Sequence, residues 1–168
     1  MNWGQAFLQQ SKSDLDIFQS MLQDSTVSRN HALHYLQMAT EKLCKVDLNR
    51  QTWTNEPKHS HYVLVPFLNN LKQVQGRATR KKLNYRLSDV EFGQHIDKLL
   101  PLAEKIQNLV PSKNDRRNCE YPWCEASGNV IVPCEHDYVD IVGNIEFENF
   151  VQLIKDLMGV IPVPPSFD

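Results

Sequence analysis

Glycine is scarce in this sequence, which has only six among its 168 residues. It contains no glycine-rich phosphate loop, no nucleophile elbow of the G-x-S-x-G type and no HExxH metal motif. These absences argue against a Rossmann-type enzyme, an α/β-hydrolase and a zincin protease. Function has to be argued from the helices and from individual titratable side chains.

Excess charge and long apolar runs are also missing. The net charge of -2 and the pI near 6.3 predict no global attraction to nucleic acid or to a membrane, although a local basic patch would be enough to bind RNA. No apolar run approaches the roughly 20 residues that span a bilayer, and the first residues do not resemble a signal peptide. Four cysteines without a secretion signal are expected to be reduced thiols. We therefore expect a cytoplasmic protein with no membrane partner.

The stretch His31–Val46 has the clearest helical pattern. Hydroxyl side chains just upstream, ending at Ser28, offer caps for the first turn, and the polar stretch Asn49–Glu56 should follow the last turn. Glu41 and Lys45 stand in the order that favours an i,i+4 ion pair, worth about 0.2–0.5 kcal/mol when exposed. Apolar residues recur at intervals of four and three to form one stripe: Ala32, Leu36, Ala39, Leu43 and Val46.

The same periodicity predicts four further helices, at Trp3–Gln23, about Ser60–Gln75, Ser88–Val110 and about Ile145–Met158. Polar residues of the first helix, within Gln9–Lys12 and Asp14–Asp16, are expected to face solvent. Pro101 should kink the Ser88–Val110 helix or split it, Gly76 and Gly159 should end helices, and Pro66 should lie within two turns of a helix start or delay it.

The stretch Cys119–Asp140 has a different composition, with aromatics, prolines and a short β-branched run, which predicts a small hairpin or an ordered loop. The prolines of Val160–Asp168 predict an extended tail. The predicted fold is therefore all-α: an antiparallel helical bundle of four to five helices in a single domain over 1–168, with a hairpin or loop insertion at 119–140 before the last helix and a proline-rich tail at 160–168.

One set of residues resembles the HEPN superfamily over about Ser13–Gln75. These helical bundles often show an H-x-x-Q-x-A-x-E-K-x-x-K helix, followed by Ser/Thr-His at the head of the next helix. The matching residues here are His34, Gln37, Ala39, Glu41, Lys42 and Lys45, then Ser60 and His61. The stretch Cys119–Tyr138 has no counterpart in the general superfamily, so the chain resembles a divergent branch.

The resemblance implies a protein that is commonly a homodimer and acts in bacterial defence or in a toxin–antitoxin system, with RNA or an antitoxin-like protein as partner. Many members are metal-independent endoribonucleases that need no cofactor, and their signature is an arginine with a histidine four to six residues later. Arg29 and His34 match it. A histidine can move a proton at a ribose hydroxyl, and an arginine can hold the charge of a phosphate. Members usually carry this pair in a later helix, so the alternative is a solvated Arg29 and a packing or hydrogen-bonding His34.

A second candidate site is a zinc site at Cys119, Cys124, Cys134 and His136. Thiolate and imidazole are suitable ligands, and a small loop with little core could need a metal. The spacing lacks the usual short knuckles, so the alternative is that these cysteines pack as small apolar residues or lie free.

A third candidate is the basic run 77–86, in which Arg77, Arg80, Lys81 and Lys82 could follow an RNA backbone while Tyr85 stacks on a base. Its alternative is an ordinary solvated surface. Two functions remain open at this point: a HEPN-like protein that binds or cleaves RNA, and a non-catalytic interaction module that dimerises or docks a partner protein.

Overall fold

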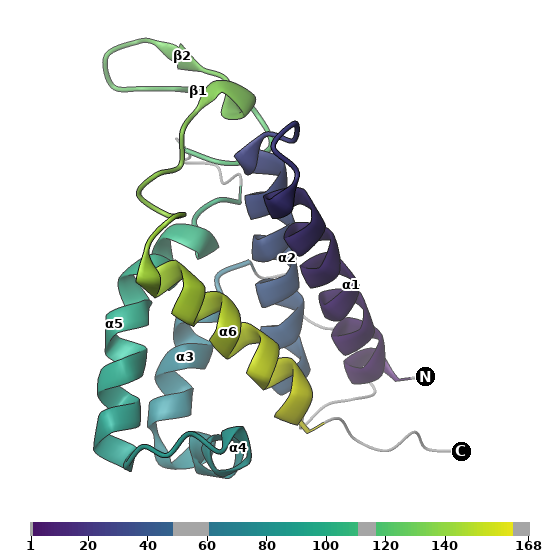
Figure 1. Ribbon diagram of the computed structural model, residues 1–168, viewed down its shortest axis with the longest axis vertical. Helices are drawn as coiled ribbons and strands as arrows, with labels where there is room; N and C mark the ends of the chain where they lie inside the picture. The colour runs from purple at the N-terminus through teal and green to yellow at the C-terminus, as the bar shows by residue number, and fades with distance from the viewer. Residues whose placement is uncertain (1, 49–60, 111–116, 163–168) are drawn as a thin grey trace.

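The computed structural model describes residues 2–48, 61–110 and 117–162 (Figure 1). The chain is an all-α bundle with one two-stranded sheet, which confirms the predicted fold class. Within the described residues, six α-helices form, one more than expected. They are α1 (Trp3–Gln23), α2 (Arg29–Leu48), α3 (Leu64–Lys72), α4 (Arg77–Leu83), α5 (Asp89–Gln107) and α6 (Ile145–Val160).

Helices α1 and α2 form an antiparallel pair along one side of the molecule (Figure 1). Asn2 starts α1 with a complete capping box, in which its side chain accepts from the Gln5 N–H and the Gln5 side chain accepts in return. The predicted stripe of α2 is buried as expected. The fully buried Ser11 hydroxyl of α1 donates to the Ala39 carbonyl at 2.7 Å, so the two backbones approach closely where α2 carries a small residue.

The other helices close the core from the opposite side. Ser88 precedes α5 and forms a second capping box with Glu91. Helix α5 runs through Pro101 as one helix, so of the two effects predicted for this proline, a kink or a split, the split is wrong. Helix α6 crosses the bundle diagonally and packs Phe147 edge-on against Phe18 of α1.

Predicted helix ends in two places need correction. Helix α3 ends at Lys72, ahead of Gly76, with Pro66 in its first turn as predicted, and a 3₁₀ turn follows at Val74–Gly76. Gly76 is required there because a Cβ atom would lie 2.5 Å from the Leu71 backbone. Gly159 lies inside α6, which continues to Val160.

The predicted insertion is present and includes a hairpin of β1 (Trp123–Cys124) and β2 (Val130–Ile131), paired antiparallel. Gly128 supplies the positive φ of 88° that the turn requires. A 3₁₀ turn follows at Pro133–Glu135. The hairpin lies at the end of the molecule where α2 begins (Figure 1).

The base of the insertion is firmly anchored in the core. Tyr138 is completely buried and its hydroxyl donates to the Asn118 carbonyl at 2.9 Å. The Asp140 carboxylate forms ion pairs with the Arg117 guanidinium at 2.7 Å and with the Lys105 ammonium of α5 at 3.1 Å. The hydrogen bond from Arg117 and the nearby Lys105 lower the pKa of Asp140 to about 2, although partial burial opposes them. The end of the insertion is thus bonded to the two residues just before it, Arg117 and Asn118, and to α5.

None of the helices in the described ranges has the length and apolarity that crossing a membrane would require.

Candidate functional site

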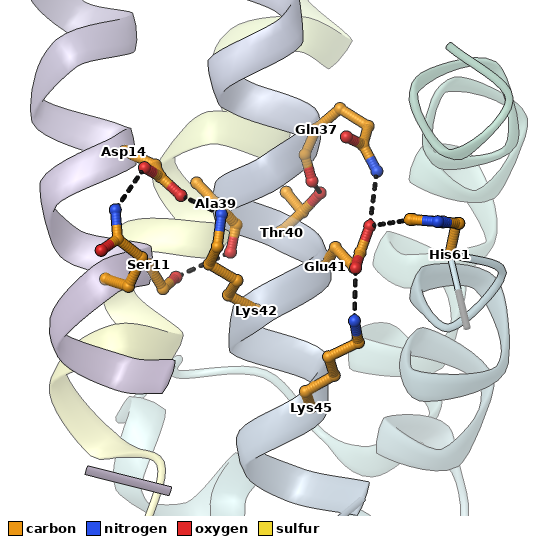
Figure 2. A network of polar contacts seen from close by, with 10 residues as sticks. Ser11, Asp14, Gln37, Ala39, Thr40, Glu41, Lys42, Lys45 and His61 are labelled. Carbon is orange, nitrogen blue, oxygen red and sulfur yellow. Dashed lines mark hydrogen bonds and ion pairs between the residues drawn. The ribbon is translucent and has the colours of Figure 1, made fainter. Parts of the chain in front are cut away.

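The first polar cluster lies in the middle of α2 and is centred on Glu41 (Figure 2). One oxygen of the Glu41 carboxylate accepts a hydrogen bond from the Lys45 ammonium. Its other oxygen receives the Gln37 amide at 3.0 Å and lies 2.7 Å from Nδ1 of His61. The predicted i,i+4 pair is therefore present, and His61 bonds the neighbouring helix α2. Four matching residues of the HEPN-like pattern meet here; Ser60 lies outside the described residues.

A second ionic contact lies on the other side of α2. Lys42 reaches Asp14 of α1 at 2.6 Å, and Gln10 donates to the other Asp14 oxygen at 2.9 Å (Figure 2). The Asp14 side chain is only 2% exposed. The prediction that Asp14 and Ser11 belong to the wet face of α1 is wrong, because the two helices bury these polar groups between them and satisfy them there.

Chemically, the Glu41 cluster can hold an imidazole in a fixed orientation and exchange a proton through it. About half of the His61 side chain stays exposed, whereas Glu41 and Lys45 are nearly buried. Each oxygen of the carboxylate is already occupied by a donor from the same chain. We interpret the cluster as a structural device that fixes the start of the α3 segment against α2.

Acid should weaken this cluster. Burial raises the pKa of Glu41, but the hydrogen bonds from Lys45, His61 and Gln37 outweigh burial, and the pKa lies below its ordinary value of 4.5. A carboxyl with a lowered pKa in the folded state stabilises the fold above the unfolded-state pKa, and this contribution is lost as pH falls through the folded-state pKa.

Replacement of Glu41 by Gln is therefore expected to cost about 1.5–3 kcal/mol at pH 7, the range for hydrogen bonds to a charged group, and progressively less as pH falls below about 4.5 and through the lowered folded-state pKa. Urea unfolding at a series of pH values measures this difference. Glu104→Gln, at an exposed position on α5, is the matched control and should change little. Equal losses at pH 7 and pH 3 would contradict the ionic role of Glu41.

Arg29 and His34 are each engaged by the insertion. Arg29 Nη1 lies 2.9 Å from Asp137, and His34 Nδ1 lies 3.5 Å from Glu120. Their side chains are 53% and 28% exposed. The His34 ring also meets Tyr35 edge-on. The structure therefore places the two residues on α2 as predicted, but it directs them to two different carboxylates.

Two uncharged contacts strengthen the same junction. The Ser28 hydroxyl donates to the Cys134 carbonyl at 2.9 Å, and the buried Asn30 amide donates to the Cys119 carbonyl at 3.0 Å. The first turn of α2 has no acidic residue of its own. Because the N-terminus of a helix favours negative charge, Asp137, which pairs with the first residue of α2, brings a favourable charge to this end of the helix.

The four candidate zinc ligands do not converge. Cys119 is buried, Cys124 and Cys134 are exposed, and the His136 ring lies between Trp123 and Tyr138, with centroids 5.3 and 4.8 Å away. In the part of the chain that the structure describes, no three His, Cys, Asp or Glu side chains form a group that could hold a metal ion. Burial raises the pKa of Cys119 to about 12, so this thiol has the packing role of the alternative interpretation.

Two members of the predicted RNA-binding run are occupied inside the protein. Arg80 is buried and donates to the carbonyls of Leu71 and Gln73, where it caps the free end of α3. The Tyr85 hydroxyl donates to Asp156 of α6 at 2.7 Å. Arg80 and Tyr85 are therefore unavailable for RNA, whereas Arg77, Lys81 and Lys82 are exposed on α4.

A groove of about 770 Å³ lies where the α1–α2 turn faces α6. Its floor is apolar and buried, formed by Ala32, Val142 and Phe147. Half-buried Met21 and Val27 and the exposed Leu22 line one wall, and one face of α6 lines the other. That face carries Glu148, Val151, Gln152 and Lys155. An apolar floor with a polar rim is typical of a docking surface.

Several of these features were missed in the sequence. The burial of Asp14 had one signal: it lies four residues before the buried Phe18 and next to the buried Leu15, on the inward side of α1. Glu120 and Asp137 had none, because their partners are about 90 to 110 positions away in the chain.

No family model matches this chain, and no significant similarity to a curated protein or to a solved structure was found.

Proposed function

We propose that this chain is a HEPN-like helical protein that works by docking another protein chain rather than by cutting RNA. In keeping with the resemblance, we place it in the bacterial cytoplasm, in a defence or toxin–antitoxin system, as a homodimer that holds a partner protein.

One observation carries this proposal: Arg29 and His34 each lie against a carboxylate of the insertion, Arg29 paired with Asp137 at 2.9 Å and His34 at 3.5 Å from Glu120. Residues five positions apart lie about 140° apart around a helix, so the two side chains leave α2 on different faces. A ribonuclease needs both groups at one phosphodiester, with the arginine free to bind the phosphate. The groove beside α6 supports docking as the positive role.

The test is incubation of a mixed RNA pool with the purified protein in EDTA. Wild type, His34→Ala and the control His31→Ala, which changes an exposed histidine of the same helix, are all expected to leave the RNA intact. Metal-free cleavage by wild type and His31→Ala that is lost in His34→Ala would overturn the docking proposal and make the ribonuclease the leading function.

A second candidate function is RNA binding without cleavage, favoured by Arg77, Lys81 and Lys82, which are exposed on α4 and have no ion pair among the described residues. Retention of the same RNA pool by the protein tests this second function. If α4 binds the backbone, retention falls steeply with salt and is lost in Lys81→Ala/Lys82→Ala. The docking proposal predicts weak retention that this double substitution does not change.

A further inference from the structure

Helix α6 has a solvent-facing stripe that the bundle does not use. Its buried stripe runs through Phe147, Phe150, Ile154 and Leu157. Beside it, the positions 148, 152, 155 and 159 recur at intervals of four, three and four, so they lie along one face. All four positions are exposed, and three of them line the groove described above: Glu148, Gln152 and Lys155.

The two charges of this stripe have no partner within the described residues. Glu148 and Lys155 cannot pair with each other, because seven residues of helix separate them by about 10 Å. They are opposite in sign and stand at opposite ends of the groove-facing stretch, with Val151 and Gln152 between them. When two copies of this stripe are placed antiparallel, each charge of one copy faces the opposite charge of the other.

A two-fold axis passing beside Val151 and Gln152 uses that property. It would place α6 of a second copy antiparallel to α6, with each Glu148 next to Lys155 of the other copy. The same register brings Ile145, which is 60% exposed, close to Gly159 of the second copy. A Cβ atom at Gly159 would meet nothing within 4 Å in its own chain, so there is room for an isoleucine.

We propose that α6 and the adjoining groove form a two-fold interface with a second copy of this chain. This inference rests on the proposed docking function and assigns the contact between the two copies of the homodimer to a surface. Such an isologous contact uses every complementary pair twice. The apolar wall at Met21, Leu22 and Val27 adds the area that a single helix pair lacks, since stable interfaces bury about 1,200–2,000 Å².

Charge reversal tests the register. In sedimentation equilibrium on the full chain, wild type should be a dimer that weakens with salt. Glu148→Lys alone or Lys155→Glu alone places like charges together at both ends of the seam, and each should raise the dimer dissociation constant about tenfold or more. The double variant Glu148→Lys/Lys155→Glu restores opposite charges and should dimerise like wild type.

Mixing provides a sharper control. An equimolar mixture of the two single variants should form heterodimers, because one chain then carries lysine at both positions and the other carries glutamate at both, so each lysine faces a glutamate. Glu104→Lys on α5 makes the same charge change away from the stripe and should leave the dissociation constant unchanged.

Gly159→Leu separates folding from association. The isolated chain has open space there and leucine favours helix over glycine, so the monomer should melt no lower than wild type. The dimer should be lost, because the new side chain fills the position that Ile145 of the second copy occupies.

A wild-type chain that stays monomeric at hundreds of micromolar would overturn the inference, as would a dimer insensitive to positions 148, 155 and 159. Occupation of the groove by a helix from a different protein would overturn it too, while leaving the docking function intact. The proposed function fails in a different assay, if wild type cleaves RNA and His34→Ala does not. Its failure is therefore distinguishable from failure of this interface.

Discussion

Replacement of Lys42 by Met is expected to cost the fold about 3–5 kcal/mol. Lys42 is the cation that faces the Asp14 carboxylate, whose side chain is 2% exposed between α1 and α2. Without Lys42, the charge of Asp14 keeps only the amide of Gln10 and has no access to water. Urea unfolding at pH 7 measures the loss as a lower midpoint with an unchanged slope.

The matched experiment removes both partners. Asp14→Leu/Lys42→Met replaces a buried ion pair with apolar side chains, which is often neutral or stabilising, so the double variant should recover most of the stability that Lys42→Met loses. Lys12→Met, at an exposed position of α1, is the control and should stay within about 0.5 kcal/mol of wild type. A Lys42→Met variant as stable as this control would show that the pair is not formed in solution.

Replacement of Tyr138 by Ala should have a similarly large effect, about 3–5 kcal/mol, although Tyr138 belongs to the insertion. The ring is fully buried, lies against His136, and has the Arg117 guanidinium 4.8 Å from its centre. Tyr138→Phe keeps the ring and loses the bond to the Asn118 carbonyl, so it should cost only about 1 kcal/mol.

Tyr121 provides the contrast within the same segment. It is 61% exposed, and Tyr121→Ala should change the free energy of unfolding by less than about 0.5 kcal/mol. If Tyr138→Ala changed stability no more than Tyr121→Ala, the insertion would be a separate loop, and its contacts with α2 would not contribute to global folding.

The elements that followed from the sequence are those with local signals. Helices α1 and α2 have apolar stripes long enough to fix their ends within a residue or two, and the start of α1 is marked by the Asn2 capping box. Helix α4 lacked such a signal: its seven residues are mostly basic, and it is held by Arg80 reaching back to α3. Pro101 was overestimated as a breaker because the surrounding apolar face is buried along the whole of α5.

The candidate sites were harder to predict because their partners are distant in the chain. The residue types at positions 29 and 34 suggested phosphate chemistry, but Asp137 and Glu120 decide what those side chains do. Spacing within one helix gave the Glu41–Lys45 pair correctly. The Lys42–Asp14 pair needed the packing of α1 on α2, which a single amphipathic pattern does not specify.

The four cysteines also allow local unfolding of the protein to be followed by chemical labelling of their thiols. Cys124 and Cys134 are exposed, so an alkylating reagent should modify them in the native state. Cys119 and Cys44 are buried, and burial raises the pKa of both thiols, so each should react only when its surroundings open. Because Cys119 lies at the base of the insertion and Cys44 in α2, the order in which these two thiols are labelled would report whether the insertion detaches before the bundle unfolds.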